Sequence, residues 1–378
     1  MAEGLQSVFG HFLDDYRQHH DLSPDQAKAC RHIEQCRTEA LGGLLQHCDR
    51  CGYEVPHYHS CRDRHCPKCQ GRAQQAWCER QRQTILPVTY YHLVFTLPHE
   101  LNGWVELHPQ VIYHLLFQSV WETLNAFGKD PKRLNGALGM TGVLHTWGQT
   151  LCRHVHLHCL IPGGALTDQG QWHETQGNYL FPVRALSRHF RGVMVGALRQ
   201  AANHGKLHRV TRPGEIDTLL DGLMTTDWVV YTKAYLKQPE TVVDYLGRYS
   251  RKVALNDRRI VGIEDGQIRL RYLDYRDHRA KVMNLSGEEL IRRFLLHILP
   301  KGFMRIRHFG FLANRCRRTK LAQIRACLDA PVPVEHNQLE SEDNQPDKGE
   351  SVVQKCPHCK VGHLIVSGEI APRRIDYG

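Results

Sequence analysis

The 378-residue sequence contains no apolar run close to the roughly 18 to 20 residues that span a bilayer. Its first residues lack the basic and apolar segments of an export signal, and we find no internal repeat and no Gly-rich phosphate loop. These absences predict a soluble, cytoplasmic protein with no membrane partner and no nucleotide cofactor.

The composition is close to that of an average globular protein, apart from an excess of basic residues. Hydrophobic residues make up 41% and charged residues 23%, which excludes global disorder and permits a sizeable core. The 49 Lys and Arg against 39 Asp and Glu leave a formal charge of +10. A basic chain attracts polyanions, so on charge alone nucleic acid is the leading candidate partner, ahead of an anionic membrane surface, which we do not expect as a partner.

Fourteen cysteines indicate metal binding rather than disulfides, because the chain is long, has its own core and lacks an export signal. Two Cys-x-x-Cys pairs lie 14 residues apart, a spacing typical of zinc ribbons and knuckles. They predict one structural Zn²⁺ held by Cys48, Cys51, Cys66 and Cys69. Cys61 is an alternative ligand, and a different fourth ligand or a second ion stays open because further candidates lie nearby: His65, Cys30, His32 and Cys36.

A third pair, Cys356 and Cys359, has no obvious second pair along the chain; its candidate partners are His363, Cys316 and Cys327. It follows residues 331–350, which hold six acidic residues against one Lys and have the composition of a flexible linker. The pair therefore either belongs to a metal site completed from elsewhere or forms no site.

Histidines alternate with apolar residues along the segment 153–161, RHVHLHCLI. In a strand this alternation puts His154, His156 and His158 on one face and the apolar side chains on the other. Two imidazoles two residues apart on a strand can ligate one cation and leave other coordination positions open for water or phosphate. The alternative is a row of solvated strand histidines without a metal.

Tyr245 and Tyr249 are four residues apart, so on a helix both hydroxyls project from one face. Basic side chains crowd the same segment: Arg248, Arg251 and Lys252. Cationic neighbours and a metal-polarised electrophile make a tyrosine oxygen competent to attack a phosphodiester. A pair of tyrosines that merely packs in the core is the alternative.

Local signals predict strands interleaved with helices. We expect strands at 89–97 and 155–161, a hairpin over 259–273 that turns at Asp265-Gly266, and helices at 109–127, at 240–253 and from the capping box at Ser286 to Pro300. Ser23-Pro24 marks a further helix start. This order indicates an α+β fold with a largely antiparallel sheet.

Over nearly its whole length the chain resembles the HUH-superfamily rolling-circle transposases of the insertion sequence 91 type. The matching runs, in chain order, are CRT at 36–38 with LGG at 41–43, the Cys48/Cys51 pair, SCRDRHCPKCQ at 60–70, LHTWGQ at 144–149, HVHLH at 154–158 with PGG at 162–164, YLGRY at 245–249, and RIRHFGFLANR at 305–315. Val155 is one departure, since relatives often have Pro there.

The resemblance implies an HUH endonuclease domain, with a central antiparallel sheet and a tyrosine-bearing helix, preceded by a small zinc-binding module. It divides the chain into a helical lead-in (1–30), a zinc-binding domain (31–85), the HUH domain (86–330), an acidic linker (331–352) and a C-terminal Cys-x-x-Cys tail (353–378). By the match, His156 and His158 hold a catalytic Mg²⁺ or Mn²⁺. His145, eleven residues before His156, is the expected third ligand, with Gln149 as the alternative.

The resemblance also implies the activity: a DNA transposase of a bacterial insertion sequence that is associated with the nucleoid. Tyr249 is the expected primary nucleophile and Tyr245 the second, acting on single-stranded DNA at element ends and target. Cleavage would leave a 5′-phosphotyrosine and a free 3′-OH.

Basic residues near the matching runs are the candidate DNA contacts: Arg248, Arg251, Lys252, Arg305, Arg307 and Arg315. The segment 305–318 is basic, and Phe303, Phe309 and Phe311 lie within or beside it, which suits phosphate contact and base stacking. A buried edge strand with a solvated face is the alternative. Two other functions remain candidates for the chain: a plasmid replication initiator or relaxase with the same chemistry, and a non-catalytic zinc-dependent DNA-binding protein.

Overall fold

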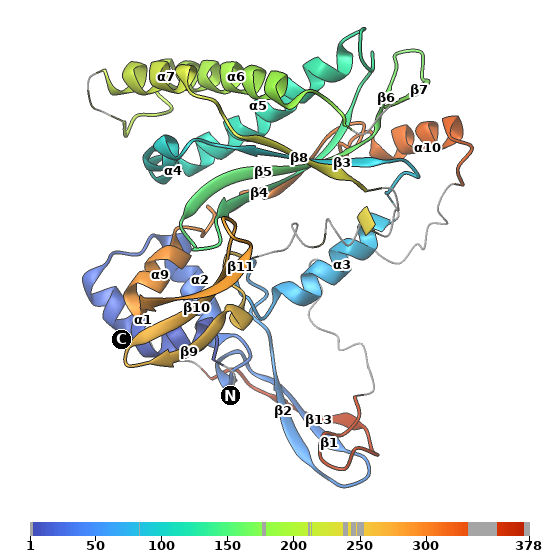
Figure 1. Ribbon diagram of the computed structural model, residues 1–378. Helices are drawn as coiled ribbons and strands as arrows, with labels where there is room; N and C mark the ends of the chain where they lie inside the picture. Colours follow the sequence, from blue (N-terminus) through green and yellow to red (C-terminus); the bar gives the residue numbers. More distant parts are fainter. Residues whose placement is uncertain are drawn as a thin grey trace.

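The computed structural model describes residues 3–82, 84–175, 179–210, 212, 214–236, 241–242, 247, 253–331 and 354–373. Figure 1 shows three parts. A large sheet with helices on one face forms the upper part, a group of helices with a smaller sheet lies below it, and a narrow three-stranded ribbon forms the foot.

The large sheet has five antiparallel strands in the order β12-β4-β5-β3-β8. Their bounds are β3 (Tyr90–Thr96), β4 (Gly139–Trp147), β5 (Arg153–Pro162), β8 (Val230–Leu236) and β12 (Ile306–Gly310). Every strand pair in it is antiparallel. The predicted strands at 89–97 and 155–161 and the antiparallel sheet are confirmed.

Four helices cover one face of this sheet (Figure 1): α4 (Asn102–Leu107), α5 (Pro109–Lys129), α6 (Val183–Asn203) and α7 (Glu215–Thr225). Helix α5 confirms the helix predicted at 109–127. The apolar residues of β5, among them Val155 and Leu157, pack with Phe117 of α5 and Phe190 of α6. Since side chains alternate along a strand, the histidines of β5 lie on the opposite face. No helix in the described part of the chain is both long and apolar enough to cross a membrane.

A second core joins the N-terminal helices to a later segment of the chain. It contains residues of α1 (Leu5–His19), α2 (Pro24–Gln35), β9 (Ile260–Glu264), β10 (Gln267–Asp274), β11 (Arg279–Ser286) and α9 (Gly287–Leu295). The short helix η3 (Asp257–Arg259) precedes β9 and has no buried residue. The capping residues Ser23 and Ser286 accept hydrogen bonds from the backbone N–H three residues on, as the sequence predicts. The hairpin that turns at Asp265-Gly266 is also confirmed. This core contains residues from 5–36 and from 254–295, which the predicted division assigns to different domains. The predicted domain boundaries stay a prediction.

A third apolar cluster lies beside the sheet. Trp77 of α3 (Gln70–Arg82) and Ile324 of α10 (Arg317–Cys327) pack with Tyr90 and Leu160 of the sheet. The remaining short elements are η2 (His99–Leu101), β6 (Gly164–Leu166) and β7 (Trp172–Glu174).

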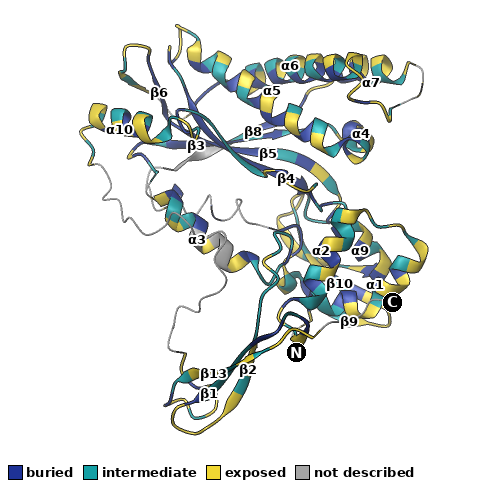
Figure 2. Ribbon diagram, turned by 180° about the vertical axis from the view of Figure 1, so that it is seen from behind, coloured by how far each residue is buried: buried dark blue, intermediate teal, exposed yellow. Residues whose placement is uncertain are grey.

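The ribbon at the foot contains residues from both ends of the chain. After η1 (Glu39–Leu41) come β1 (Gly43–Cys48) and β2 (Glu54–Tyr58), and β13 (Leu364–Ile370) pairs with the free side of β1. Most ribbon residues are partly or fully exposed, whereas the strands of the large sheet are mostly buried (Figure 2). The ribbon therefore has little apolar core of its own.

Candidate functional site

Three histidines of the large sheet lie together on the face opposite α5 and α6. His145 of β4 pairs directly across from His156 of β5, and His158 follows two residues later on the same face. Their ligand nitrogens all lie within 4.8 Å of one another. The sequence predicted these three residues as metal ligands, and the structure brings them together.

Hydrogen bonds orient two of these rings. The Nδ1 of His156 lies 2.8 Å from the carbonyl oxygen of His154. A carbonyl only accepts, so Nδ1 carries the proton and Nε2 keeps the lone pair that binds a cation. The Nδ1 of His158 lies 2.9 Å from Nε2 of His92 on β3, and the two rings stack. This contact fixes the plane of the His158 ring.

The surroundings of His156 favour its neutral imidazole, the form that binds metals. His145 is buried and stacks on Trp147 at 4.5 Å between ring centroids. Burial lowers the pKa of His156 to about 4, so its ring is uncharged at neutral pH. Ring nitrogens that converge in this way fit Mn²⁺ or another divalent transition ion, with further positions left for oxygen ligands.

Gln149, the alternative third ligand, has its side chain bonded elsewhere. Its Nε2 donates to the hydroxyl of Tyr275 at 2.9 Å, and its Oε1 accepts from the backbone N–H of Leu273. His154 is exposed and stands outside the group of three. His145 therefore lies with His156 and His158, whereas the side chain of Gln149 is bonded elsewhere.

Five predicted site residues lie outside the described residues: Tyr245, Tyr249, Arg248, Arg251 and Lys252. Val242, three residues before Tyr245, is fully buried against Tyr90 and Leu160. Leu160 pairs across from His92 and follows His158 by two residues, so it lies on the histidine face. Val242 thus packs on the face that carries the histidine cluster.

The three remaining candidate DNA contacts have different positions. The Arg307 guanidinium lies 4.4 Å from the ring centroid of Phe117, with Phe303 also beneath it, and bonds His114 of α5. It therefore packs on the helix-covered face, away from the histidine cluster. Arg315 is exposed in the turn before α10, and Arg305 immediately precedes β12.

The cysteines form two clusters, so the prediction of one zinc site from Cys48, Cys51, Cys66 and Cys69 is wrong. One cluster is Cys36, Cys61, Cys66 and Cys69; the other is Cys48, Cys51, Cys356 and Cys359. The two predicted pairs are separated by the length of the β1–β2 hairpin. Its register runs from Gly43 opposite Tyr58 to His47 opposite Glu54, which puts one pair at the tip and the other beyond the base.

The first cluster, which we call the inner cysteine cluster, has the geometry of a tetrahedral zinc site. The Sγ of Cys69 lies 3.5 Å from that of Cys36 and 3.6 Å from that of Cys61. Zn–S bonds of about 2.3 Å in a tetrahedron separate the sulfurs by about 3.8 Å, whereas a disulfide needs about 2.05 Å. Hydrogen bonds from the thiols of Cys61, Cys66 and Cys69 lower the pKa of the Cys36 thiol.

The loop between Cys61 and Cys66 joins this cluster to the segment that enters β12. Arg64 donates to the carbonyl oxygens of Leu299, Pro300 and Phe303 at 2.9, 2.8 and 2.5 Å. His65 accepts from the backbone N–H of Leu299, and its Nδ1 bonds Asp63. The inner cysteine cluster and the large sheet are therefore held in fixed relation.

Sequence reasoning missed one of these contributions and left the other open. His92 lies inside the apolar strand segment TYYHLVFTL, and no motif marks it. Cys36 was only one of several nearby candidates, because it is not part of a Cys-x-x-Cys pair. Its position at the end of α2, next to a cysteine-rich loop, was the available signal.

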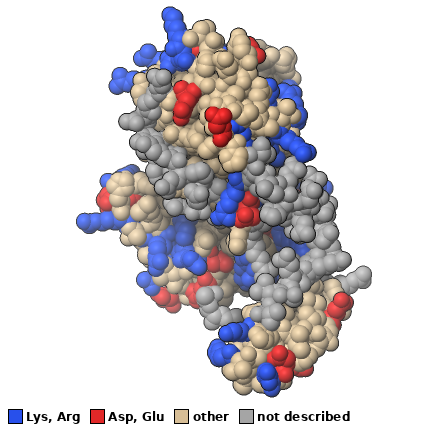
Figure 3. Space-filling view, turned by 90° about the vertical axis from the view of Figure 1, so that its right-hand side faces the viewer, with Lys and Arg blue, Asp and Glu red and all other residues tan. Residues whose placement is uncertain are grey.

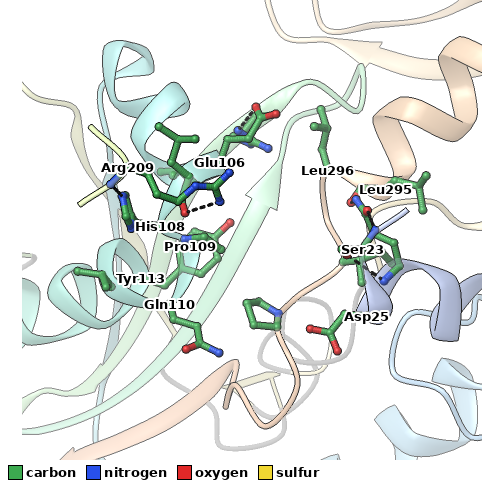
Figure 4. Close-up of a pocket in the computed structure, with 17 residues that line it drawn as sticks. Ser23, Asp25, Glu106, His108, Pro109, Gln110, Tyr113, Arg209, Leu295 and Leu296 are labelled. Carbon is green, nitrogen blue, oxygen red and sulfur yellow. Dashed lines mark hydrogen bonds and ion pairs between the residues drawn. The ribbon is translucent and has the colours of Figure 1, made fainter. Parts of the chain in front are cut away.

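A cavity of about 530 Å³ lies between the N-terminal helices and the sheet domain (Figure 4). Its walls include Asp25 in the first turn of α2 and His108, whose Nε2 accepts from the backbone N–H of Arg209. Arg153, also in the wall, pairs with Glu106 at 3.0 Å. None of the three clustered histidines lines this cavity, so it is separate from the candidate metal site.

Comparisons with known proteins agree with this arrangement. A family model described as "Putative transposase" matches residues 139–320, and one described as "Transposase zinc-binding domain" matches residues 8–97. The "Putative transposase y4qJ" of Sinorhizobium fredii (strain NBRC 101917 / NGR234) is 42% identical over 374 residues, 96% of this chain and 94% of that protein. The "Transposase for insertion sequence element IS801" of Pseudomonas savastanoi pv. phaseolicola is 29% identical over 315 residues, 79% and 73% of the two chains. No solved structure matches the chain.

Proposed function

Because the chain belongs to the transposases of the insertion sequence 91 type with an N-terminal zinc-binding domain, we propose that it cleaves and rejoins single-stranded DNA through a tyrosine nucleophile. The observation that carries this proposal is the convergence of His145, His156 and His158 on the open face of an antiparallel sheet. A protein that only binds DNA has no need of such a cluster.

The three histidines would hold a divalent cation, Mg²⁺ or Mn²⁺, through their ring nitrogens. Such an ion supplies Lewis-acid stabilisation of charge on the scissile phosphate. The hydrogen bond from His156 to the His154 carbonyl keeps its Nε2 directed to the ion. His92 is a positioning residue, since its contact with Nδ1 of His158 leaves Nε2 for the ion.

The tyrosines would perform the chemical step. The Tyr249 oxygen attacks the phosphorus, the bond to the 3′ oxygen breaks, and that oxygen takes up a proton to become a free 3′-OH. The 5′ side stays on the enzyme as a phosphotyrosine, which conserves the bond energy, so no nucleotide is consumed. Tyr245 serves as the second nucleophile in strand transfer. The burial of Val242, three residues before Tyr245, on the histidine face supports a role for these tyrosines at the histidine cluster.

The sheet with its histidine pair and the tyrosine segment leads us to assign the HUH fold to this domain and rolling-circle-type transposition to the chain. The net charge of +10 suits a DNA partner. Lys and Arg side chains lie on both the upper and lower parts of the face drawn in Figure 3. Exposed basic residues such as Arg315 are available for phosphate contact, whereas Arg307 is engaged with Phe117.

The test is a covalent adduct assay with labelled single-stranded oligonucleotides from the element ends, with Mn²⁺ or EDTA, on denaturing gels. We expect a metal-dependent protein–DNA band that Tyr249→Phe abolishes while binding is kept. His156→Ala with His158→Ala should also abolish it without unfolding the chain. His154→Ala is the matched control, because it removes an exposed histidine of the same strand and leaves the carbonyl that orients His156.

The role of His92 has a separate readout. In His92→Phe the Mn²⁺ concentration needed for half-maximal adduct should rise about 10- to 100-fold, as for other residues that orient a metal ligand. An unchanged Mn²⁺ requirement would remove this role. Binding without an adduct at any end sequence would favour a non-catalytic DNA-binding protein.

A further inference from the structure

The second cysteine cluster consists of two pairs more than 300 residues apart in the sequence. Cys48 is the last residue of β1 and Cys51 follows it, whereas Cys356 and Cys359 precede β13. We propose that these four cysteines form a second structural zinc site, which joins the C-terminal end of the chain to the N-terminal ribbon. We call this group the outer cysteine cluster. The matching zinc-binding model ends at residue 97, so half of this site lies outside it.

The sulfur positions fit one tetrahedral ion. The Sγ of Cys48 lies 3.7 Å from that of Cys359, and the Sγ of Cys51 lies 3.7 Å from that of Cys356. A tetrahedral zinc thiolate requires about 3.8 Å between sulfurs, and a disulfide about 2.05 Å. Cys48 and Cys356 are almost fully buried, although the ribbon around them has little apolar core. An ion that binds all four thiolates accounts for this burial.

The two pairs have the same backbone turn, which is the form of a zinc knuckle. The N–H of Gly52 donates to the carbonyl of Cys48, and the N–H of Lys360 donates to the carbonyl of Cys356, four residues apart in each case. Both Gly52 and Lys360 have positive φ angles, +68° and +61°. The turns also present backbone N–H groups to sulfur, from Arg50 to Cys48 and from Gly362 to Cys359. Such bonds stabilise thiolates.

The two turns that carry the cysteine pairs pack closely against each other. A Cβ on Gly362 would lie 2.5 Å from the Cys48 sulfur and 2.6 Å from Asp49, so only glycine fits there. The Asp49 carboxylate accepts from the backbone N–H of His363, which ties the two turns together. The His358 ring stacks on Tyr53, and its Nδ1 lies 3.9 Å from the sulfur of Cys51.

The site would close the chain on itself. Strand β13 pairs with β1 from Gly43 opposite Ile370 to Cys48 opposite Leu364, and Arg373 reaches Glu39. Helix α10 ends at Cys327 beside the large sheet, away from the ribbon (Figure 1). Zinc at the outer cysteine cluster therefore holds the C-terminal segment on the ribbon rather than beside the domain from which the chain comes.

The test counts zinc by elemental analysis in the full-length protein after gel filtration without DNA. The double variant Cys356→Ser with Cys359→Ser should contain one zinc ion fewer per chain than the wild type. The matched control is Cys152→Ser with Cys327→Ser, which removes two exposed cysteines outside both clusters and should lose none. Because the zinc content of each variant is compared with that of the wild type, an ion bound by the histidines contributes equally to both and does not affect the difference. An unchanged count in the first variant would overturn the proposal.

A second measurement covers the case in which the variant folds poorly. A protease recognition sequence is inserted between residues 340 and 341 of the otherwise wild-type chain, which is then cleaved. The C-terminal fragment should co-elute with the rest while zinc is bound and separate when a chelator removes it. Retention that a chelator does not affect would show that strand pairing alone holds the fragment, and would also overturn the proposal. Neither the zinc content nor the co-elution depends on DNA cleavage. A negative result in these experiments would therefore overturn the second zinc site without bearing on the proposed function.

Discussion

The two cysteine clusters have the same ligands and the same geometry but different surroundings. Cys36 and Cys66 of the inner cysteine cluster belong to an apolar core with Phe9, Trp147 and Phe294. The outer cysteine cluster lies on a ribbon whose strands are mostly exposed, with Val361 and Val366 among the exposed apolar residues. Identical metal chemistry should therefore have different consequences for the whole molecule at the two positions.

The two clusters differ in the parts of the molecule that they contact. The loop of the inner cysteine cluster contacts the segment 299–303 that leads into β12, so loss of this cluster should also destabilise the large sheet. The contacts of the outer cysteine cluster are with its own ribbon and with Tyr53. We expect the inner cysteine cluster to stabilise the fold as a whole and the outer cysteine cluster to hold one segment in place.

The largest effect should follow from Cys66→Ser. This change removes a thiolate from a buried site and leaves three cysteines without a complete tetrahedron. Structural zinc contributes about 10 kcal/mol or more to the folding of small zinc domains, so we expect a loss of more than about 3 kcal/mol here. Urea unfolding followed by tryptophan fluorescence is suitable, because Trp147 lies in the same core. Cys152→Ser is the control, and equal midpoints for the two variants would contradict the prediction.

The next effect should come from Arg64→Ala, which breaks the connection between the inner cysteine cluster and the sheet. The change removes a guanidinium that satisfies three partly buried carbonyl oxygens. Hydrogen bonds to charged groups are worth about 1.5 to 3 kcal/mol, so we expect a loss of about 2 kcal/mol in the free energy of unfolding. Arg64→Lys keeps the charge but cannot reach all three oxygens. Its free energy of unfolding should lie between those of the wild type and Arg64→Ala. A wild-type midpoint in Arg64→Ala would show that the contacts are dispensable.

The same contrast explains what the sequence could predict. The helix starts at Ser23 and Ser286 and the turn at Asp265-Gly266 depend only on neighbouring residues, so these starts and the hairpin were predicted at the right places. Helix α9 ends at Leu295, earlier than the predicted end at Pro300. The histidine face of β5 followed from alternation along a single strand. The cross-strand partner His145 came from the family resemblance.

The cysteine pairing could not be predicted, because it depends on which chain segments meet in space. A separation of 14 residues suits one ribbon site, but the β1–β2 hairpin moves the two pairs apart. Cys48 and Cys359 are 311 residues apart in the sequence, and no local pattern indicates that their sulfurs lie 3.7 Å apart in the folded chain. His92 was missed for the same reason, since only the pairing of β3 with β5 brings it to His158.

A smaller effect should come from Glu289→Gln, at the junction of α9 with the sheet. Glu289 accepts from Arg292 and Arg293, and Arg293 also donates to the carbonyl of Thr150 in the β4–β5 turn. Hydrogen bonding with Arg292 lowers the pKa of Glu289 from 4.5 to about 2. The pairs are partly exposed and screened by solvent, so we expect a loss of about 0.5 to 1 kcal/mol at pH 7.

The pH dependence of that difference has a defined sign. A carboxyl whose pKa is lower in the folded state stabilises the fold above the unfolded value and loses this contribution as the pH falls. The gap between wild type and Glu289→Gln should therefore be constant above about pH 4.5 and shrink between pH 4.5 and 2. Urea midpoints measured at pH 7, 5 and 3 would check it. A gap that grows on acidification would contradict the assignment, and Glu264→Gln, in an exposed pair with Arg269, should show almost no gap.

The smallest loss of stability in the molecule outside the ribbon should come from Gly362→Ala, which tests the outer cysteine cluster. The added Cβ would lie 2.5 Å from the Cys48 sulfur and 2.7 Å from the Cβ of Arg50, so the two knuckles cannot keep their positions. We expect the loss of one zinc ion per chain, with an unfolding midpoint for the rest of the molecule within about 0.5 kcal/mol of the wild type, as for surface changes. Gly368→Ala is the matched control, because a Cβ at that position of β13 meets nothing within 4 Å and should keep both zinc ions. If Gly362→Ala instead destabilised the molecule outside the ribbon as strongly as Cys66→Ser does, the two clusters would belong to one cooperative unit. Their different surroundings would then not determine what each contributes.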